Sequence, residues 1–172
     1  MDRATEAKNL RRRYGALGLL AVGLAGAQAL ANWRNDHLIL INETASLDHW
    51  AFLVDRRAVP ERGDFAFFVA PQNDLVTRHF GSHAPPFGKR VYGVGGDRVS
   101  RNGHVVRVNG RAIARLKPFT KTGEALTPGP VGIIPPGCFY MGSPHRDGLD
   151  SRYGEIGFVC RGQLVGTGEA IL

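Results

Sequence analysis

The sequence predicts a mainly β domain, either a compact barrel or a coiled β-sheet, behind one N-terminal transmembrane helix. An uncharged stretch occupies residues 15–31, and short apolar runs separated by turn residues recur from residue 37 onward. No long amphipathic helical pattern follows the uncharged stretch. At 172 residues the chain has room for one domain of ordinary size plus a short appendage.

The N-terminal segment has the charge pattern of a membrane anchor. Residues 1–14 hold five basic and two acidic side chains, so +3 of the formal net charge of +7 lies in this tail. The uncharged run reaches the short end of the range of about 17 to 25 residues that spans a bilayer as a helix. Because arginine and lysine are enriched on the cytoplasmic side of a membrane, we expect a cytoplasmic tail (1–14), a transmembrane helix (15–33) and an exported domain (34–172).

A cleaved signal peptide is the competing interpretation of this segment. Residues 25–31, "AGAQALA", offer small residues at the A-x-A spacing of a cleavage site. Nucleic-acid binding is disfavoured, because membrane topology explains the basic tail and only scattered arginine pairs follow it. The lipid bilayer is therefore the expected partner, with no nucleic acid.

Short apolar runs predict the strands of the exported domain. They lie at residues 37–41, 65–70, 90–94, 97–100, 105–110, 131–135, 138–142, 156–160 and 163–168. Two Asn-Gly dipeptides, at 102–103 and 109–110, predict hairpin turns because both residue types tolerate positive φ. Stretches rich in Gly, Pro and Thr at 81–88 and 118–130 predict loops.

Lys89 is the most informative single residue for chemistry. The chain has four lysines against eighteen arginines, and only Lys89 opens a predicted strand. An arginine could not act as a base there, since its guanidinium stays charged, whereas burial can lower the pKa of a lysine enough to make it one. The alternative is a lysine that protects a sheet edge or extends its ammonium into water.

A neutral lysine could activate a serine hydroxyl for nucleophilic attack. The chain has five serines, at positions 46, 82, 100, 143 and 151. Ser82 and Ser100 have loop and turn surroundings, while Ser46 follows a predicted strand and precedes a bulky apolar run. Ser46 is the better candidate, but spacing alone leaves the choice among the serines open.

Four segments carry a pattern in their order and spacing: "NETAS" (42–46), "RGDFAFF" (62–68), "GKRVYGVGGDRVS" (88–100) and "MGSPHRDGLDSRYGEIG" (141–157). Together they resemble the boxes of the type I signal peptidase family of serine–lysine membrane proteases. The single membrane segment, the short chain and the Thr-x-Ser pattern resemble its conjugative-transfer, TraF-like branch, which matures pilin precursors.

This resemblance implies roles for individual residues. Ser46 matches the nucleophile and Lys89 the general base, while Thr44 matches the hydroxyl that joins the Ser46 N–H in the oxyanion hole. Asp150 and Arg152 match a structural ion pair near the site. The family implies a single-pass protein of the bacterial inner membrane with a periplasmic catalytic domain, no cofactor or metal, and a leader-bearing precursor as substrate.

The last box departs from the family pattern around the lysine. Gly148 replaces the serine that often hydrogen-bonds the catalytic lysine, so Ser143 or Ser151 would have to orient it. Ser143 and His145 also stand where the family has Asp and Arg, so Arg90 is expected to lack its usual carboxylate partner.

Residues near Ser46 differ from the family pattern, so other functions stay possible for the chain. Asp48 stands where the family usually has Pro, and Trp50 where the conjugative branch tends to have Gly. The alternatives are a general leader peptidase, or a noncatalytic assembly protein that uses the same β domain to hold a pilus or secretion component.

The two cysteines and the histidines were considered as further sites. Cys138 and Cys160 lie at nearly equal distances from the turn at 150–152, so they either form a disulfide across paired strands or remain two free thiols. His79 and His83 are four residues apart in a predicted loop, and without a C-x-x-C motif a metal site is not expected.

Overall fold

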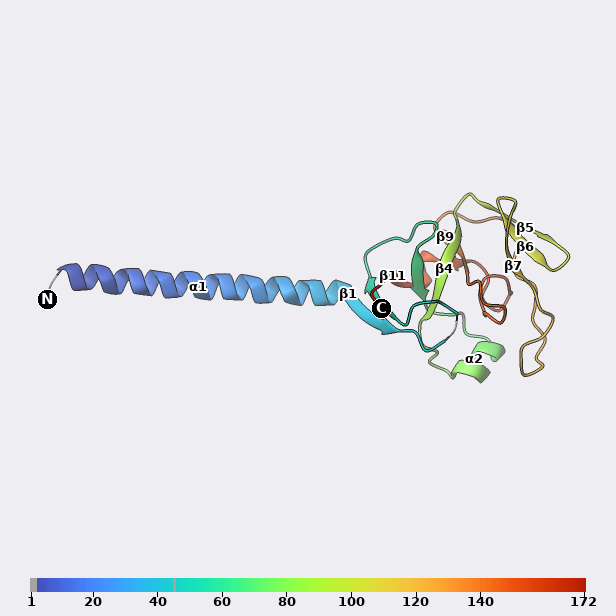
Figure 1. Cartoon of the computed structure of the whole chain (residues 1–172), viewed down its shortest axis with the longest axis horizontal. Helices are drawn as coiled ribbons and strands as arrows, with labels where there is room; N and C mark the ends of the chain where they lie inside the picture. Colours follow the sequence, from blue (N-terminus) through green and yellow to red (C-terminus); the bar gives the residue numbers. More distant parts are fainter. Residues whose placement is uncertain (1–2, 45) are drawn as a thin grey trace. The chain divides into compact units, whose positions relative to one another are not determined.

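The computed structural model describes residues 3–44 and 46–172, and the chain divides into two compact units, residues 1–37 and 38–172. The first unit is helix α1 (Arg3–Asp36), drawn in blue in Figure 1. Among the described residues, one helical segment, 11–36, is long and apolar enough to cross a membrane. The helix extends beyond the predicted 15–33 because the basic tail is rich in strong helix formers such as Ala, Arg, Lys and Leu. A signal sequence has the same length and composition, so the two interpretations of this segment stay predictions.

The second unit is built on two antiparallel sheets, which confirms the mainly β fold class (Figure 1). In spatial order the larger sheet contains β1 (His37–Ile41), β2 (Ala51–Asp55), β11 (Leu164–Ala170), β3 (Phe65–Phe68), β4 (Phe87–Val94), β9 (Cys138–Gly142) and β10 (Val159–Cys160). The smaller sheet contains β7 (Arg111–Arg115), β6 (Val105–Val108), β5 (Arg98–Asn102) and β8 (Gly132–Ile133). Helix α2 (Asp74–Phe80) and the short 3-10 helix η1 (Arg161–Gln163) complete the unit.

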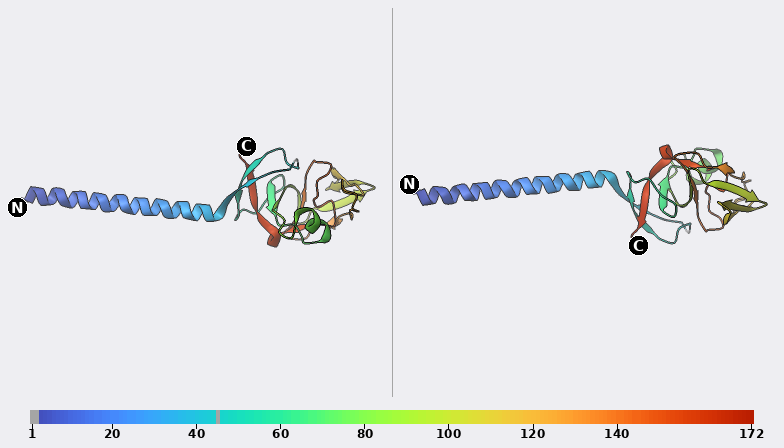
Figure 2. Two further views of the ribbon diagram at one scale, coloured as in Figure 1. Left: turned by 90° about the horizontal axis from the view of Figure 1, so that it is seen from below. Right: turned by 90° about the horizontal axis from the view of Figure 1, so that it is seen from above.

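Strand β11, near the C-terminus, pairs with two strands from the N-terminal part of the β domain. It pairs antiparallel with β2 on one side and with β3 on the other, and Figure 2 shows it in red. The larger sheet therefore depends on contacts between segments far apart in the sequence.

The register around β4 determines where Lys89 points. Lys89 lies directly opposite Ala66 of β3, and the next residue, Arg90, lies opposite Gly142 of β9. Buried and partly exposed residues alternate along the whole of β4, and Lys89 is at a buried position. Because side chains alternate between the two faces of a strand, the lysine turns toward the core.

That core is one of three clusters of buried apolar side chains in the domain. It contains the residue opposite the lysine, both residues two positions away from it on β4, and side chains from β3, α2, β9 and β10. Its buried members are Ala66, Phe68, Ala70, Val76, Phe87, Val91, Phe139, Met141, Ile156 and Val159.

Four elements were not predicted from the sequence: strands β2 and β7, helix α2 and the short 3-10 helix η1. Strand β2 was interpreted only as an apolar run, and β7 has just three apolar residues between two arginines at the edge of its sheet. Helix α2 has seven residues, too few for a periodic pattern, and begins where Asn73 accepts a hydrogen bond from the Val76 N–H. His79 consequently lies on a helix and not in a loop.

Both predicted hairpin turns are present. Asn109 and Gly110 adopt φ of 49° and 80° between β6 and β7, as a two-residue turn of this type requires. Gly103 has a φ of 55° between β5 and β6.

Cys138 and Cys160 form a disulfide in the structure. They lie directly opposite each other on the paired strands β9 and β10. The bond therefore ties the edge strand β10 to β9, and β9 is the strand that pairs with β4.

Candidate active site

Asn42 organises the loop that carries Ser46. Its side-chain amide donates hydrogen bonds to the carbonyl groups of Leu47 (3.2 Å) and His49 (3.0 Å). Its Oδ1 accepts from the Thr44 hydroxyl (3.0 Å) and from the Thr44 N–H (3.2 Å). Asn42 was not among the predicted site residues, although an Asn two residues before a hydroxyl-bearing residue is a signal of such a side-chain turn.

Ser46 lies beside Thr44, the other residue expected to act on the substrate carbonyl. The two hydroxyl oxygens are 2.7 Å apart, and the Ser46 N–H lies 3.5 Å from Thr44 Oγ1. Ser46 is buried, at 8% exposure, while Thr44 is exposed. Thr44 is thus an exposed residue with its hydroxyl next to the Ser46 oxygen.

Lys89 is buried, at 6% exposure. Its Nζ lies 5.9 Å from the centre of the Phe87 ring. Desolvation lowers the pKa of Lys89 below the ordinary lysine value; the charge of Asp150 opposes this shift and the charge of Arg152 adds to it. A buried lysine of this kind loses its proton more readily than an exposed one, which is the requirement for a general base.

The segment that carries Ser46 packs against the strand that carries Lys89. A Cβ placed on Gly88 would lie 3.2 Å from Leu47 Cδ1, so the residue after the serine touches the residue before the lysine. Within residues 3–44 and 46–172, no hydrogen bond links Ser46 to Lys89, and their pairing as a catalytic dyad stays a prediction.

Asp150 and Arg152 form a buried ion pair. Arg152 Nε donates to Asp150 Oδ1 at 2.7 Å, and the Arg152 guanidinium also donates to Oδ2 at 2.8 Å. The exposed fractions of the two side chains are 2% for Arg152 and 0% for Asp150. Ser151, between them, accepts a hydrogen bond from the Met141 N–H at 3.0 Å, so its side chain is directed at the backbone of β9.

Arg90 has no carboxylate among its partners in the described part of the chain. It donates to the Gly63 carbonyl at 3.2 Å, and its guanidinium carbon lies 4.5 Å from the centre of the Phe65 ring. The stacked arginine therefore holds the segment before β3 against β4.

The boxes at 62–68 and 88–100 meet through an ion pair. Arg62 donates to both carboxylate oxygens of Asp97, each at 2.6 Å, and Asp97 also accepts from the Val94 N–H and from the Asn109 side chain, both at 2.8 Å. Burial alone would raise the pKa of Asp97, but these hydrogen bonds and the Arg62 charge hold it below its ordinary value. Arg62 and Asp97 thus fix the turn between β4 and β5.

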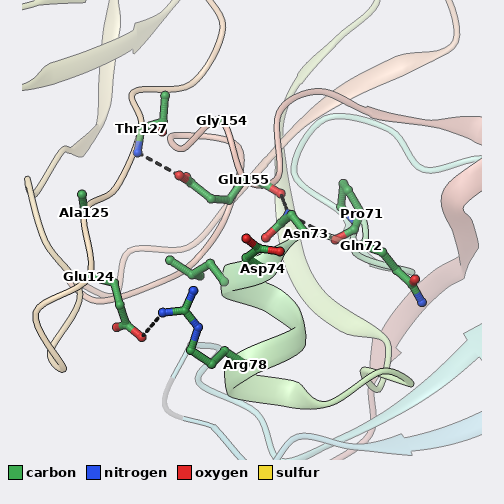
Figure 3. A pocket seen from close by; sticks show the side chains of 11 residues that line it. Pro71, Gln72, Asn73, Asp74, Arg78, Glu124, Ala125, Thr127, Gly154 and Glu155 are labelled. Carbon is green, nitrogen blue, oxygen red and sulfur yellow. Dashed lines mark hydrogen bonds and ion pairs between the residues drawn. The ribbon is translucent and has the colours of Figure 1, made fainter.

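A separate hollow of about 940 Å³ contains neither Ser46 nor Lys89 (Figure 3). Its polar groups bond to one another: Arg78 lies 3.9 Å from Glu124, and Glu155 accepts from the Thr127 N–H at 2.9 Å. The lining residues are Pro71, Gln72, Asn73, Asp74, Leu75, Arg78, Glu124, Ala125, Thr127, Gly154 and Glu155. No serine, lysine or cysteine lines this hollow, so it is a weaker candidate for nucleophilic chemistry than the Ser46 region.

Over the ranges that the structure describes, no group of three or more His, Cys, Asp and Glu side chains is arranged to hold a metal ion.

An apolar N-terminal helix followed by a mainly β domain with a buried lysine fits the class of membrane-anchored hydrolases. The chain belongs to the signal peptidase family, peptidase S26, whose family model matches residues 12–172. Membership implies a serine endopeptidase and supports a leader peptidase function, and the apolar helix fits a membrane-anchored protein.

Among solved structures, a signal peptidase I is similar to this chain. A signal peptidase I from Enterococcus faecalis V583 aligns with a TM-score of 0.40 and 21% identity, over 64% of this chain and 97% of that chain. No curated protein matches. The TraF-like branch remains a prediction from the sequence resemblance.

Proposed function

We propose that the chain is a membrane-anchored leader peptidase in which Ser46 is the nucleophile and Lys89 the general base. The observation that carries this proposal is the burial of Lys89 in β4 of a signal peptidase family domain. Burial disfavours the charged form of a lysine and so opposes folding, which favours a functional reason for Lys89 over a structural one.

The chemistry requires Lys89 to be neutral when the substrate arrives. Its Nζ lone pair takes the proton of Ser46 Oγ, and the oxygen attacks the carbonyl carbon of the scissile peptide bond. The Thr44 hydroxyl and the Ser46 N–H donate to the oxyanion that forms. The Lys89 ammonium then protonates the leaving amine. Water attacks the acyl-enzyme while Lys89 accepts its proton, and Lys89 returns that proton to Ser46 Oγ as the acyl group leaves.

The absence of a Ser46–Lys89 hydrogen bond in the free protein is compatible with this mechanism. Catalytic hydrogen bonds are often long without substrate and tighten in the Michaelis complex. The contact between Leu47 and Gly88 already holds the two segments together, which supports their pairing in the complex with substrate.

The proposed substrate is the leader-bearing precursor of an exported protein, specifically a pilin precursor, as the resemblance to the conjugative branch suggests. Trp33 and Ser46 are thirteen positions apart in the sequence, a distance of at most about 45 Å even for an extended chain. Ser46 would therefore cleave near the bilayer surface, where a membrane-embedded precursor presents its cleavage site. Catalysis in the periplasm requires the tail at 1–14 to be cytoplasmic.

Cleavage assays with the full-length protein in lipid vesicles test this function. With a pilin precursor, the wild-type protein is expected to generate a new N-terminus, identified by mass spectrometry. Ser46→Ala and Lys89→Met should each abolish it, while Ser82→Ala, which changes an exposed loop serine, should not. Full cleavage by the Ser46 or the Lys89 variant would refute the proposal.

The same assay separates the alternative functions. Equal cleavage of unrelated leader-bearing precursors indicates a general leader peptidase. Binding of the precursor without a new N-terminus indicates a noncatalytic assembly protein.

A further inference from the structure

The register of the larger sheet indicates which residue follows β9 across from Lys89. Arg90 lies opposite Gly142 in the β4–β9 pairing, and continuing this register by one residue puts Ser143 across from Lys89. On the other side of β4, Lys89 lies opposite Ala66, which has no polar side-chain atom. Ser143 is therefore the hydroxyl that the neighbouring strands offer to the lysine.

The side chain of Ser143 lacks the partner that a buried hydroxyl needs. Ser143 is 1% exposed, and its Oγ has no hydrogen-bond partner among the described residues. Its backbone is fully engaged: the N–H donates to Asp150 Oδ2 at 3.1 Å, and the carbonyl accepts from Arg152 at 2.6 Å. Because buried polar groups are nearly always hydrogen-bonded, an orphaned hydroxyl on a fixed backbone indicates a function.

Gly148 leaves the space that this hydroxyl fills. A Cβ at position 148 would lie 2.4 Å from Ser143 Oγ and 3.1 Å from Asp150 Oδ2. The hydroxyl of Ser143 thus occupies the space that a side chain at 148 would enter. Serine at 143 and glycine at 148 form a compensating pair, since a serine at both positions would overlap.

Ser151 is less suited to the same task. Its hydroxyl already accepts a hydrogen bond of 3.0 Å from the Met141 N–H, which directs it toward the backbone of β9. Of the two serines that the sequence offered to orient the lysine, Ser143 has the uncommitted side chain.

We propose that Ser143 is the positioning residue for Lys89: its Oγ accepts a hydrogen bond from Lys89 Nζ and directs the lone pair of the amine toward Ser46. The inference rests on the proposed function. A neutral amine has two N–H bonds and one lone pair, so fixing an N–H fixes the direction in which the nitrogen accepts a proton. The charged groups acting on Lys89 are Asp150 and Arg152, which also hold the Ser143 backbone.

Two variants test this role: one removes the hydroxyl at position 143, and the other moves it to position 148. The measurement is the kinetics of precursor cleavage by the full-length enzyme. Ser143→Ala should lower kcat by about 10- to 100-fold, a range typical of misoriented catalytic groups, with KM within about twofold of wild type. The acidic limb of its pH–rate profile should move to lower pH, because the ammonium loses an acceptor. Ser143→Ala combined with Gly148→Ser should restore kcat and return the limb. Ser82→Ala is the control.

Each outcome shows whether Ser143 positions Lys89 or not. Wild-type kcat and pH profile in Ser143→Ala would overturn the inference, as would a double variant that folds poorly or cleaves no better than Ser143→Ala. If Ser143→Ala does not fold, the double variant alone decides, because it contains both the volume and the hydroxyl. Inactive Ser46→Ala and Lys89→Met with a fully active Ser143→Ala would refute only the positioning role, whereas active Ser46 and Lys89 variants would refute the proposed function.

Discussion

The guanidinium of Arg152 holds the buried carboxylate of Asp150 through hydrogen bonds of 2.7 and 2.8 Å, and the same two side chains bind both backbone polar groups of Ser143. The ion pair therefore fixes the chain where it leaves β9, beside Lys89. Its importance lies in this geometry, since a buried ion pair by itself is weak evidence of stability.

Asp150→Asn is expected to destabilise the domain by about 3 to 5 kcal/mol, because it leaves the Arg152 charge buried without a counter-charge. Chemical denaturation of the full-length protein in detergent measures the loss. Arg146→Gln, an exposed change in the same loop, should alter the free energy of unfolding by less than about 0.5 kcal/mol. Equal effects of the two substitutions would contradict the structural role of the pair.

Thr44→Val is expected to lower kcat for precursor cleavage by about 100-fold, since it removes an oxyanion donor while keeping the shape of the side chain. Thr44→Ser retains the hydroxyl and should stay close to wild type. Single-turnover cleavage kinetics compare the two variants. If both are equally active, Thr44 does not stabilise the oxyanion.

Gly88→Ala is expected to disturb the contact between the nucleophile loop and β4. The added Cβ would lie 2.7 Å from Phe67 Cε1 and 3.2 Å from Leu47 Cδ1. Overpacking of this kind costs about 1 to 3 kcal/mol, and displacement of Leu47 should also slow cleavage.

Gly162→Ala provides the matched control for this substitution, because a Cβ there meets no atom within 4 Å. Denaturation and cleavage are measured on both variants. A Gly88→Ala protein as stable and active as Gly162→Ala would show that Leu47 can move without consequence.

Lys89→Met should abolish cleavage and stabilise the fold at neutral pH. The folded-state pKa of Lys89 lies below the ordinary 10.5, so between these two values the unfolded chain binds more protons than the folded one. Wild-type stability must therefore rise with pH across this window, and the advantage of the Met variant must shrink as pH approaches 10.5.

Urea denaturation at a series of pH values measures this dependence. Lys121→Met, which changes a lysine with a 73% exposed side chain, should keep the wild-type slope. A Lys89→Met protein with the same pH slope as wild type would mean that Lys89 is not the group responsible.

Much of the fold follows from local sequence patterns. The strand at 138–142 was predicted with its observed limits, because an apolar run there lies between a Pro-Pro-Gly turn and the glycine that ends it. Strand β7 was not predicted, although the Asn109-Gly110 turn indicates a hairpin there, because its apolar run has only three residues and it lies at the edge of its sheet. Helix α2 is similarly short and is anchored partly by Asn73, which reaches the distant Glu155 carbonyl.

Some features of the candidate site could be predicted from the sequence, and others depend on the fold. Lys89 stood out in the sequence because a lysine in an apolar strand is rare, and the structure buries it. The unpaired hydroxyl of Ser143 and its proximity to Gly148 depend on the sheet register and on a buried ion pair, so only the folded chain reveals them. Asn42 is intermediate, because a local turn signal was present but its four hydrogen bonds were not predictable.

The Cys138–Cys160 bond makes the newly synthesised chain and the mature chain chemically different molecules. Such bonds persist in oxidising compartments and are rare in the cytosol. The cross-link lies at the start of β9, the strand that leads to Ser143. If the domain is exported as proposed, the sheet edge supporting the proposed base is cross-linked only after the chain has crossed the membrane, so the site becomes fully rigid in the compartment where precursors emerge.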